Sequence, residues 1–344
     1  MNGKVANAGR RLDDIRLDGL LLNSRMINGV FDDRNPTTRD KWVYPDTGQW
    51  DAERNTREFV AEMAGWRADG LDAFTLGVQG GSPFGYSKDQ PWDSGGYEPD
   101  GALRPDFFDR IGRILDEADR LGFAVILNLF YQGQEQRLLN DDAVRRAVVD
   151  SARFVLDGGW ENVAIEIANE CNIPHCYTHS TLMRGENVHE LITLAQSVES
   201  EGRRLLVSSS FVDTRRLVGP DAVVVSSEVL EVADFVLLHG NGTPTPGTVP
   251  ELADILRADS AYRGVPIIVN EDDHFDFGAD DNHMRAALRA GISWGYFDPG
   301  SETTWPEPKS TPGDYENGFQ NVPVNWGLSS ERKRQFFQVC RSAR

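Results

Sequence analysis

The sequence predicts an α/β fold in which a single (β/α)₈ barrel occupies residues 1–344. The first observation is a set of eight short apolar runs, each typical of a strand buried on both faces of a parallel sheet. The second is that segments with apolar residues at helical spacing lie between these runs. The third is that the chain shows neither an internal repeat nor a low-complexity linker that would divide it into domains. The eight runs span residues 20–26, 71–79, 123–131, 162–170, 205–210, 234–239, 266–271 and 292–297.

The helices between these runs are indicated by their apolar stripes and by signals at their ends. The first helix is expected to end near Gly70, which lies where a C-cap glycine would. Pro105 fits the first turn of the helix after the second strand, and Ser329 can cap the last helix. Residues 222–225 are also apolar, but we interpret them as a short extra piece rather than a barrel strand. The predicted helices cover residues 51–70, 105–121, 141–155, 186–201, 251–257, 282–290 and 329–339.

Long loops are expected after strands 2, 4 and 8. Residues 80–104 and 298–327 are rich in glycine, proline and aromatic residues and are too long to be simple connections. In a (β/α)₈ barrel such loops lie on the C-terminal face, where active sites are built. They would raise walls around that face, which favours a pocket for short substrates or chain ends over an open groove.

Charge limits the kinds of partner that the chain can have. It contains 54 acidic and 35 basic residues, so its formal charge is −19. A field of this sign repels polyphosphate and anionic lipid, which argues against nucleic-acid and membrane partners. A neutral carbohydrate is compatible with it, although an acidic surface also simply aids solubility. The sequence does not predict an oligomeric state.

Several further features bear on the compartment. No run approaches the ~20 apolar residues of a membrane-spanning helix. The three cysteines, Cys171, Cys176 and Cys340, do not make a disulfide framework. Residues 1–10 lack the apolar core of a signal peptide. We therefore expect a cytoplasmic protein, or a secreted one if a signal peptide was removed from this chain.

Two of the predicted strands end in the same way, with an asparagine followed by a glutamate. Asn169 and Glu170 end the fourth run, and Asn270 and Glu271 end the seventh, 271 − 170 = 101 residues later. An ionised carboxylate is costly to bury, so each of these strand ends is expected to open into a polar cleft. Two glutamates delivered by two strands to one cleft are the equipment for hydrolysing a glycosidic bond.

The run from Glu166 to Glu170 resembles the E-x-x-N-E strand-four signature of the clan A retaining glycoside hydrolases. Glu271 on the seventh strand and Trp294 on the eighth also match the layout of that clan. The resemblance implies that Glu170 is the general acid/base, Glu271 the nucleophile, and Asn169 the group that binds the sugar 2-hydroxyl. Retaining hydrolysis needs two carboxyls roughly 5–5.5 Å apart, one protonated and one ionised.

The chain departs from family 5 cellulases and mannanases of this clan at three places. These enzymes usually carry a histidine on strand three, where this chain offers Asn128, Tyr131 and Gln132. They usually have a proline after the strand-four glutamate, where this chain has Cys171. Strand six keeps its histidine, His239, but lacks the tyrosine often found beside it. The barrel and the two glutamates survive these differences, whereas the family and the sugar are not assigned.

Other side chains at the strand ends are candidates for substrate binding. We expect Arg25, Asn128 and Tyr131 to contact the substrate. His239 is expected to bond the nucleophile or the sugar, the alternative being a histidine satisfied in the barrel rim. Trp294 either packs in the core or forms the floor on which a sugar stacks, and its place on strand eight favours the floor.

Glu166 is expected to be structural, because it lies within the buried part of its strand and would need a partner such as Arg25 or His239. The aromatic residues of the last long loop are each expected to anchor that loop to the scaffold rather than to stack on a sugar. They are Trp305, Tyr315 and Trp326.

Asp272, Asp273 and His274 directly follow the predicted nucleophile. We expect one of the acids, Asp273, to contact sugar hydroxyls, while metal ligation and a favourable start to the next helix are the alternatives. The competing hypothesis for the whole chain is a metal-dependent barrel hydrolase that uses these three residues with His239 and His175.

Cys171, His175, Cys176 and His179 have a spacing that permits zinc, but they lack the paired C-x-x-C knuckles of a strong zinc motif. We therefore expect no metal and interpret this segment as a flexible loop bordering the cleft. A third hypothesis is a carbohydrate-binding barrel that has lost catalysis, against which both intact glutamates argue. No nucleotide-binding glycine motif occurs, so no cofactor is expected.

Overall fold

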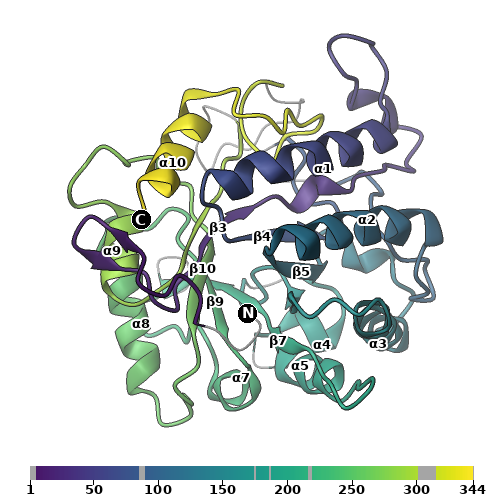
Figure 1. The fold of residues 1–344 in the computed structure, drawn as a ribbon. Helices are drawn as coiled ribbons and strands as arrows, with labels where there is room; N and C mark the ends of the chain where they lie inside the picture. The colour runs from purple at the N-terminus through teal and green to yellow at the C-terminus, as the bar shows by residue number, and fades with distance from the viewer. Residues whose placement is uncertain are drawn as a thin grey trace.

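The computed structural model describes residues 5–84, 90–173, 176–185, 187–215, 219–300 and 315–343. Its centre is a set of parallel strands, and helices surround them on the outside (Figure 1). The strands at the centre are β3 (Leu22–Arg25), β4 (Ala73–Gly77), β5 (Ala124–Phe130), β6 (Val163–Ala168), β7 (Leu206–Ser208), β8 (Ser210–Val212), β9 (Val236–His239), β10 (Ile267–Glu271) and β11 (Trp294–Tyr296).

These strands form a ring of eight positions within the described residues. Six pair in the order β11-β3-β4-β5-β6-β7 and three in the order β10-β9-β8, all parallel. The fifth position is shared, because β7 pairs with β6 and β8 pairs with β9, with Ser209 between them. Parallel bridges from Ile268 to Ser293 and from Asp272 to Tyr296 join β10 to β11. The predicted α/β class and (β/α)₈ barrel are confirmed.

A helix follows each of the eight barrel positions. The helices are α1 (Ala52–Ala68), α2 (Pro105–Leu121), α3 (Asp141–Asp157), α4 (Ser180–Met183), α5 (Val188–Gln196), α7 (Ser227–Val232), α8 (Thr248–Ala258), α9 (His283–Arg289) and α10 (Glu331–Ser342). A short antiparallel pair, β1 (Arg11–Leu12) and β2 (Ile15–Arg16), precedes the barrel and contacts α9. None of the described helices is both long and apolar enough to cross a membrane.

The ends of these helices follow local rules that the sequence displays. The Asp51 carboxylate accepts the Arg54 N–H and caps α1, and Pro105 opens α2. Gly122 ends α2 at φ 73°, a left-handed conformation that glycine adopts without strain. Ser330, rather than Ser329 as predicted, caps α10, so that prediction was wrong by one residue. Residues 222–225 lie outside the strands, as expected.

The space inside the barrel is layered because residues two positions apart on a strand face the same way. The deepest layer is a separate apolar cluster, whose buried members are Ile126, Phe235 and Leu237. Two positions further along the same or neighbouring strands the interior becomes polar, and its fully buried side chains there include Thr75, Asn128, Glu166 and Asn270. The catalytic face therefore rests on a polar layer, which in turn rests on an apolar floor.

The observed cap of α10 gives a stability test. Ser330 Oγ accepts the Lys333 N–H at 3.3 Å. We expect Ser330→Ala to lower the free energy of unfolding by ~1 kcal/mol, because the N–H loses its acceptor. Ser330→Asp supplies another acceptor and should remain close to the wild type. Urea denaturation measures the free energy of unfolding of both variants. An alanine variant as stable as the wild type would show that the Ser330 hydroxyl does not stabilise α10.

Candidate active site

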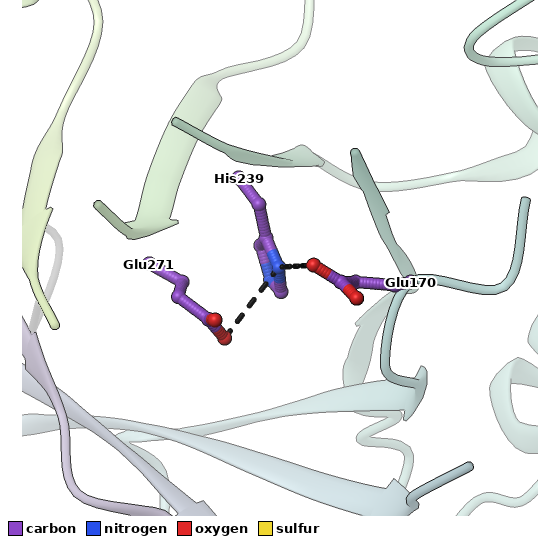
Figure 2. A group of neighbouring side chains, drawn as sticks. All are labelled: Glu170, His239 and Glu271. Carbon is purple, nitrogen blue, oxygen red and sulfur yellow. Dashed lines mark hydrogen bonds and ion pairs between the residues drawn. The ribbon is translucent and has the colours of Figure 1, made fainter. Parts of the chain in front are cut away.

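The structure brings Glu170 and Glu271 together at the C-terminal face of the barrel, with the His239 imidazole between them (Figure 2). One carboxylate oxygen of each glutamate and one nitrogen of His239 all lie within 4.8 Å of one another. Glu271 ends β10 and His239 ends β9, whereas Glu170 follows β6 by two residues. The separation suits the roughly 5–5.5 Å that retaining glycoside hydrolysis requires.

Glu170 sits in an unusual backbone conformation. Its φ is 46°, in the left-handed region that residues with a Cβ seldom occupy. The conformation is held by its own N–H, which donates to Ser210 Oγ at 2.9 Å, and by the N–H of Cys171, which donates to the Ser210 carbonyl. Non-glycine residues in this region cluster at functional sites, where the surrounding structure enforces the strain. Here the turn aims the Glu170 carboxyl at His239 rather than along the strand.

Arg25 is the central cation of the site. It is 1% exposed, and its Nε lies 2.6 Å from Glu271 Oε2. Its Nη2 donates to Asn169 Oδ1 at 2.5 Å, and its Nη1 lies 3.6 Å from Glu166 Oε2. Asn270 also donates to that Glu166 oxygen, at 3.2 Å. Glu166 is therefore a partner of Arg25, as predicted.

The contacts around the two glutamates close into a ring. From Arg25 it passes to Asn169, whose Nδ2 donates to Gln132 Oε1 at 2.8 Å. Gln132 Nε2 in turn donates to Glu170 Oε2 at 3.4 Å. His239 Nδ1 lies 2.9 Å from Glu170 Oε1 and 3.5 Å from Glu271 Oε2. The last link, from Glu271 back to Arg25, is the 2.6 Å ion pair.

The two glutamates sit in different electrostatic surroundings. Burial raises the pKa of Glu170 to about 7, well above the usual range of a glutamate, which favours the protonated carboxyl. Burial also raises the pKa of Glu271, but the Arg25 guanidinium opposes that shift at direct contact. Burial lowers the pKa of His239, which favours a neutral imidazole. The arrangement thus favours a protonated Glu170, while direct contact with Arg25 favours the ionised form of Glu271 against the effect of burial.

Two residues of the site were not predicted as site residues. Asn241 Nδ2 donates to Glu271 Oε1 at 2.5 Å, so both Glu271 carboxylate oxygens are held, one by Asn241 and the other by Arg25. Gln132 joins Asn169 to Glu170. Both lie in loops beyond a strand end, where apolar patterning gives no guide to direction. The only sequence signal was position, two residues after His239 and one after Tyr131.

Two other predicted substrate-binding residues border the glutamates. The Tyr131 hydroxyl lies 3.0 Å from Ser82 Oγ, and burial, with the Glu271 charge, raises the pKa of Tyr131. Asp273 Oδ1 accepts the Gly242 N–H at 3.4 Å, and its charge adds slightly to the pKa of Glu170, which burial raises.

Asn128 lies deeper than predicted. It is fully buried in the polar layer, where it pairs in register with Glu166. No described residue hydrogen-bonds its side-chain amide. A direct contact with substrate would require the sugar to reach below the two glutamates. Asn128 therefore belongs to the polar layer, and the prediction that it contacts the substrate is wrong.

The prediction that Trp294 forms a stacking floor is wrong. Its exposure is 0%, its rings pack against Phe277 and Phe336, and its Nε1–H donates to Asp272 Oδ2 at 2.8 Å. The inward position of β11 belongs instead to Gly295, where an added Cβ would come within 2.1 Å of Asn23 Oδ1. Alternation along the strand therefore turns Trp294 outward, into the layer between barrel and helices.

The loop aromatics anchor the last loop where they are described. Trp326 is 1% exposed and its Nε1–H donates to Asn55 Oδ1 at 3.1 Å. Tyr315 makes an edge contact with Tyr44. Trp305 lies outside the described residues.

Residues of metal-ligating type gather at two places in the described part of the chain. One is the group formed by the two glutamates and His239, and the other is Asp272, Asp273 and His274. In the second, Asp272 already accepts the Trp294 N–H and lies 2.6 Å from His274 Nδ1. His239 thus belongs to the glutamates and not to the acidic triplet, which weakens the metal-dependent alternative.

The cysteine–histidine segment makes contacts of other kinds. Cys171 Sγ lies 3.5 Å from the Ser210 carbonyl oxygen, and His179 Nδ1 lies 3.2 Å from Asp141 Oδ1. His175 lies outside the described residues. Cys171 and His179 thus have partners outside this segment, and the spacing that permits zinc remains only a sequence pattern.

Comparisons with known proteins support the fold. No family model and no curated protein sequence matches the chain. Among solved structures it is similar to a GH5-4 broad-specificity endoglucanase from Clostridium longisporum, with 12% identity, a TM-score of 0.57, and coverage of 94% of this chain and 97% of that one. It is also similar to an endo-1,4-β-mannanase from Rhizomucor miehei (12% identity, TM-score 0.52, coverage 80% and 85%). A third is a GH1 β-glucosidase from Exiguobacterium antarcticum (12% identity, TM-score 0.50, coverage 80% and 87%).

The chain therefore has the (β/α)₈ fold of glycoside hydrolases from families 5 and 1. The resemblance to clan A that the strand-end motifs indicated is confirmed at the level of the fold. Identities of this size assign neither a family nor a substrate.

The raised pKa of Glu170 predicts the alkaline limb of activity. The acid must carry its proton, so kcat/KM should fall as the pH rises through about 7, with a slope of one proton. A pH profile with a glycoside that has a poor leaving group measures this limb. In Glu170→Gln the limb should vanish, and a limb that persists there would belong to another group.

Asn241 gives a second prediction. Removing its N–H from Glu271 in Asn241→Ala should lower kcat/KM on the order of 10- to 100-fold, because a hydrogen bond to a charged group contributes ~1.5–3 kcal/mol. The acidic limb of the pH profile should also move to higher pH, since the ionised carboxylate loses a donor.

Asn325→Ala is the matched control for this substitution, because Asn325 donates to Glu316 at 3.0 Å at the surface. It should leave both readings unchanged. Equal kcat/KM and equal pH profiles for the two variants would show that Asn241 does not support the function of Glu271.

Proposed function

We propose that the chain is a retaining glycoside hydrolase that acts on a neutral glycoside or oligosaccharide by double displacement. The observation that carries the proposal is the opposition of Glu170 and Glu271 within 4.8 Å, with a proton favoured on the first and an ion pair on the second. The fold shared with glycoside hydrolases supports the same reading. The paired carboxylates themselves are the stronger argument, because fold alone does not fix chemistry.

In the first displacement a Glu271 oxygen attacks the anomeric carbon and the bond from that carbon to the leaving oxygen breaks. The Glu170 proton passes to the leaving oxygen, so an alcohol departs and Glu170 is left ionised. Asn169 has one N–H on Gln132, and its second N–H is available to a sugar 2-hydroxyl. A hydrogen bond of this kind strengthens as charge develops on the sugar, which stabilises the transition state more than the bound substrate.

In the second displacement water attacks the anomeric carbon of the glycosyl ester. Esterification removes the negative charge of Glu271, so the pKa of Glu170 falls and its carboxylate stays ionised. This carboxylate then takes a proton from the attacking water as the ester bond breaks. Glu271 regains its charge beside Arg25 and Asn241, and Glu170 is protonated again. Two inversions leave the product with the anomeric configuration of the substrate.

The long segments after β4, β6 and β11 favour a pocket, and with it cleavage at chain ends or of short substrates. This part of the proposal rests on loop length and on the C-terminal position of the segments. Product analysis on oligosaccharides of increasing length tests it. Release of one terminal unit at a time is expected, whereas random fragments from the middle of a polymer would contradict it.

Substitution of each glutamate tests the mechanism. With nitrophenyl glycosides and oligosaccharides, we expect Glu170→Ala to lower turnover on the order of 10²- to 10⁴-fold for poor leaving groups. Azide should restore its turnover when the leaving group is good, because a small anion can then replace water without base assistance. We expect Glu271→Ala to be inactive with natural substrates.

Glu161→Ala, a surface substitution, is the matched control and should retain full activity. Chelator treatment completes the set, and the wild type should keep its rate in EDTA. If both glutamate variants retained wild-type rates on a confirmed substrate, or if metal restored a rate lost to EDTA, the proposal would be wrong.

A further inference from the structure

A second hollow lies on the C-terminal face, and no member of the ring around the glutamates lines it. Its volume is about 290 Å³, near the lower end of small-molecule sites. Its walls come from the segments that follow β3, β4 and β5, the last two around Asp93–Pro99 and Gln134–Leu138. These are βα loops, the part of a barrel on which binding sites are built.

Four charged side chains line this hollow, and their charges cancel. Arg34 lies 3.5 Å from Asp93 and 3.3 Å from Glu98, and Arg137 lies 3.3 Å from the other Asp93 oxygen. An anion entering here meets two carboxylates and a cation meets two guanidinium groups. The lining therefore selects against a charged ligand, in a protein whose net charge of −19 would otherwise favour cations.

The remaining walls combine apolar and polar groups. Tyr97, Pro99 and Leu138 supply apolar surface, and the Tyr97 ring is fixed by packing against Phe130 and by its hydroxyl contact with Ser151. A lining that combines apolar surface with paired acids and guanidiniums suits a ring that has C–H faces and hydroxyl edges. A purely apolar ligand would instead displace water from these paired charged groups without offering them a hydrogen bond.

Gln134 also lines the hollow, and its amide is held by backbone contacts. It is 1% exposed, and its Nε2 donates to the Trp92 carbonyl at 3.1 Å. No described residue donates to its Oε1. Gln134 is therefore a fixed part of the wall rather than a group whose oxygen a ligand reaches.

We propose that this hollow is a second carbohydrate site that binds one uncharged sugar ring, apart from the site of the two glutamates. It is connected to that site through Gln79, which lines the hollow, bridges to Gly95 and accepts the Tyr131 N–H on Oε1 at 2.9 Å. The binding function goes beyond the proposed hydrolysis, and it does not require turnover.

The first experiment places the ligand. Crystals of the wild-type protein are soaked with D-glucose, D-xylose and D-galactose, and separately with the charged D-glucuronate and D-glucosamine. Density for at least one neutral sugar is expected between Tyr97 and Gln134. In solution, the indole N–H signal of Trp92 reports binding by NMR, since that residue contacts Gln134 through its carbonyl. The charged sugars should bind at least tenfold more weakly.

The second experiment fills the hollow. An added Cβ at Gly95 would make only an ordinary contact with Gln79 at 3.5 Å, so Gly95→Leu places a side chain in the lining without a clash at its first atom. This variant should lose the sugar-dependent shift of Trp92 while retaining kcat on a nitrophenyl monosaccharide. Gly65→Leu, on the exposed side of α1 with open space at its Cβ, is the control and should bind as the wild type does.

Glu170→Ala separates this site from the catalytic one and should keep the Trp92 shift even where turnover is lost. Binding by Gly95→Leu equal to that of the wild type would overturn the proposal. So would the absence of both density and shift for all three neutral sugars, or equal affinity for the charged analogues. Each of these outcomes is independent of whether the two glutamates hydrolyse a glycoside.

Discussion

The ion pair between Arg25 and Glu271 is the interaction on which the site depends. A buried guanidinium is stable only when its charge and its donors are matched, and Arg25 finds Glu271, Glu166 and Asn169 around it. By contacting Glu271, it favours the ionised carboxylate in a place where burial favours the neutral acid. Its hydrogen bond to Asn169 also fixes the position of the residue that precedes Glu170.

The ring of contacts explains how two similar carboxyls acquire different roles. Glu271 is held on both oxygens by charged or strongly polar donors, whereas Glu170 receives only the long bond from Gln132 and the contact with a neutral His239. Burial raises the pKa of both carboxyls, and only at Glu271 does a guanidinium in direct contact oppose that shift. The polar layer below, which contains Glu166 and Asn270, gives Arg25 a second carboxylate partner. The hydrogen-bond network of the site therefore continues below the two glutamates as far as the apolar cluster.

The sequence was informative where chemistry and periodicity coincide. The two Asn-Glu endings predicted which strands carry the acids, and the alternation of apolar runs with helices predicted the barrel. The orientation of the Trp294 side chain was predicted wrongly because β11 has only three residues, too few to show an alternation of apolar and polar positions. The close approach of Gly295 to Asn23 decides which residue of β11 faces the interior.

Gln132 and Asn241 were missed for a related reason. Each lies in a loop, where direction is set by tertiary contacts such as those to Glu170 and Glu271. The split of the fifth strand at Ser209 likewise follows from pairing with two neighbours, which no local pattern encodes.

The most direct test of the account is to trap the ester that it requires. A 2-deoxy-2-fluoro glycosyl fluoride of a sugar that the protein hydrolyses slows both displacements, while the good leaving group lets the first proceed, so the glycosyl-enzyme accumulates. Mass spectrometry of the digested protein should then find the sugar on Glu271 alone. A label on any other residue, or an unlabelled enzyme that releases product of inverted configuration, would contradict the central claim.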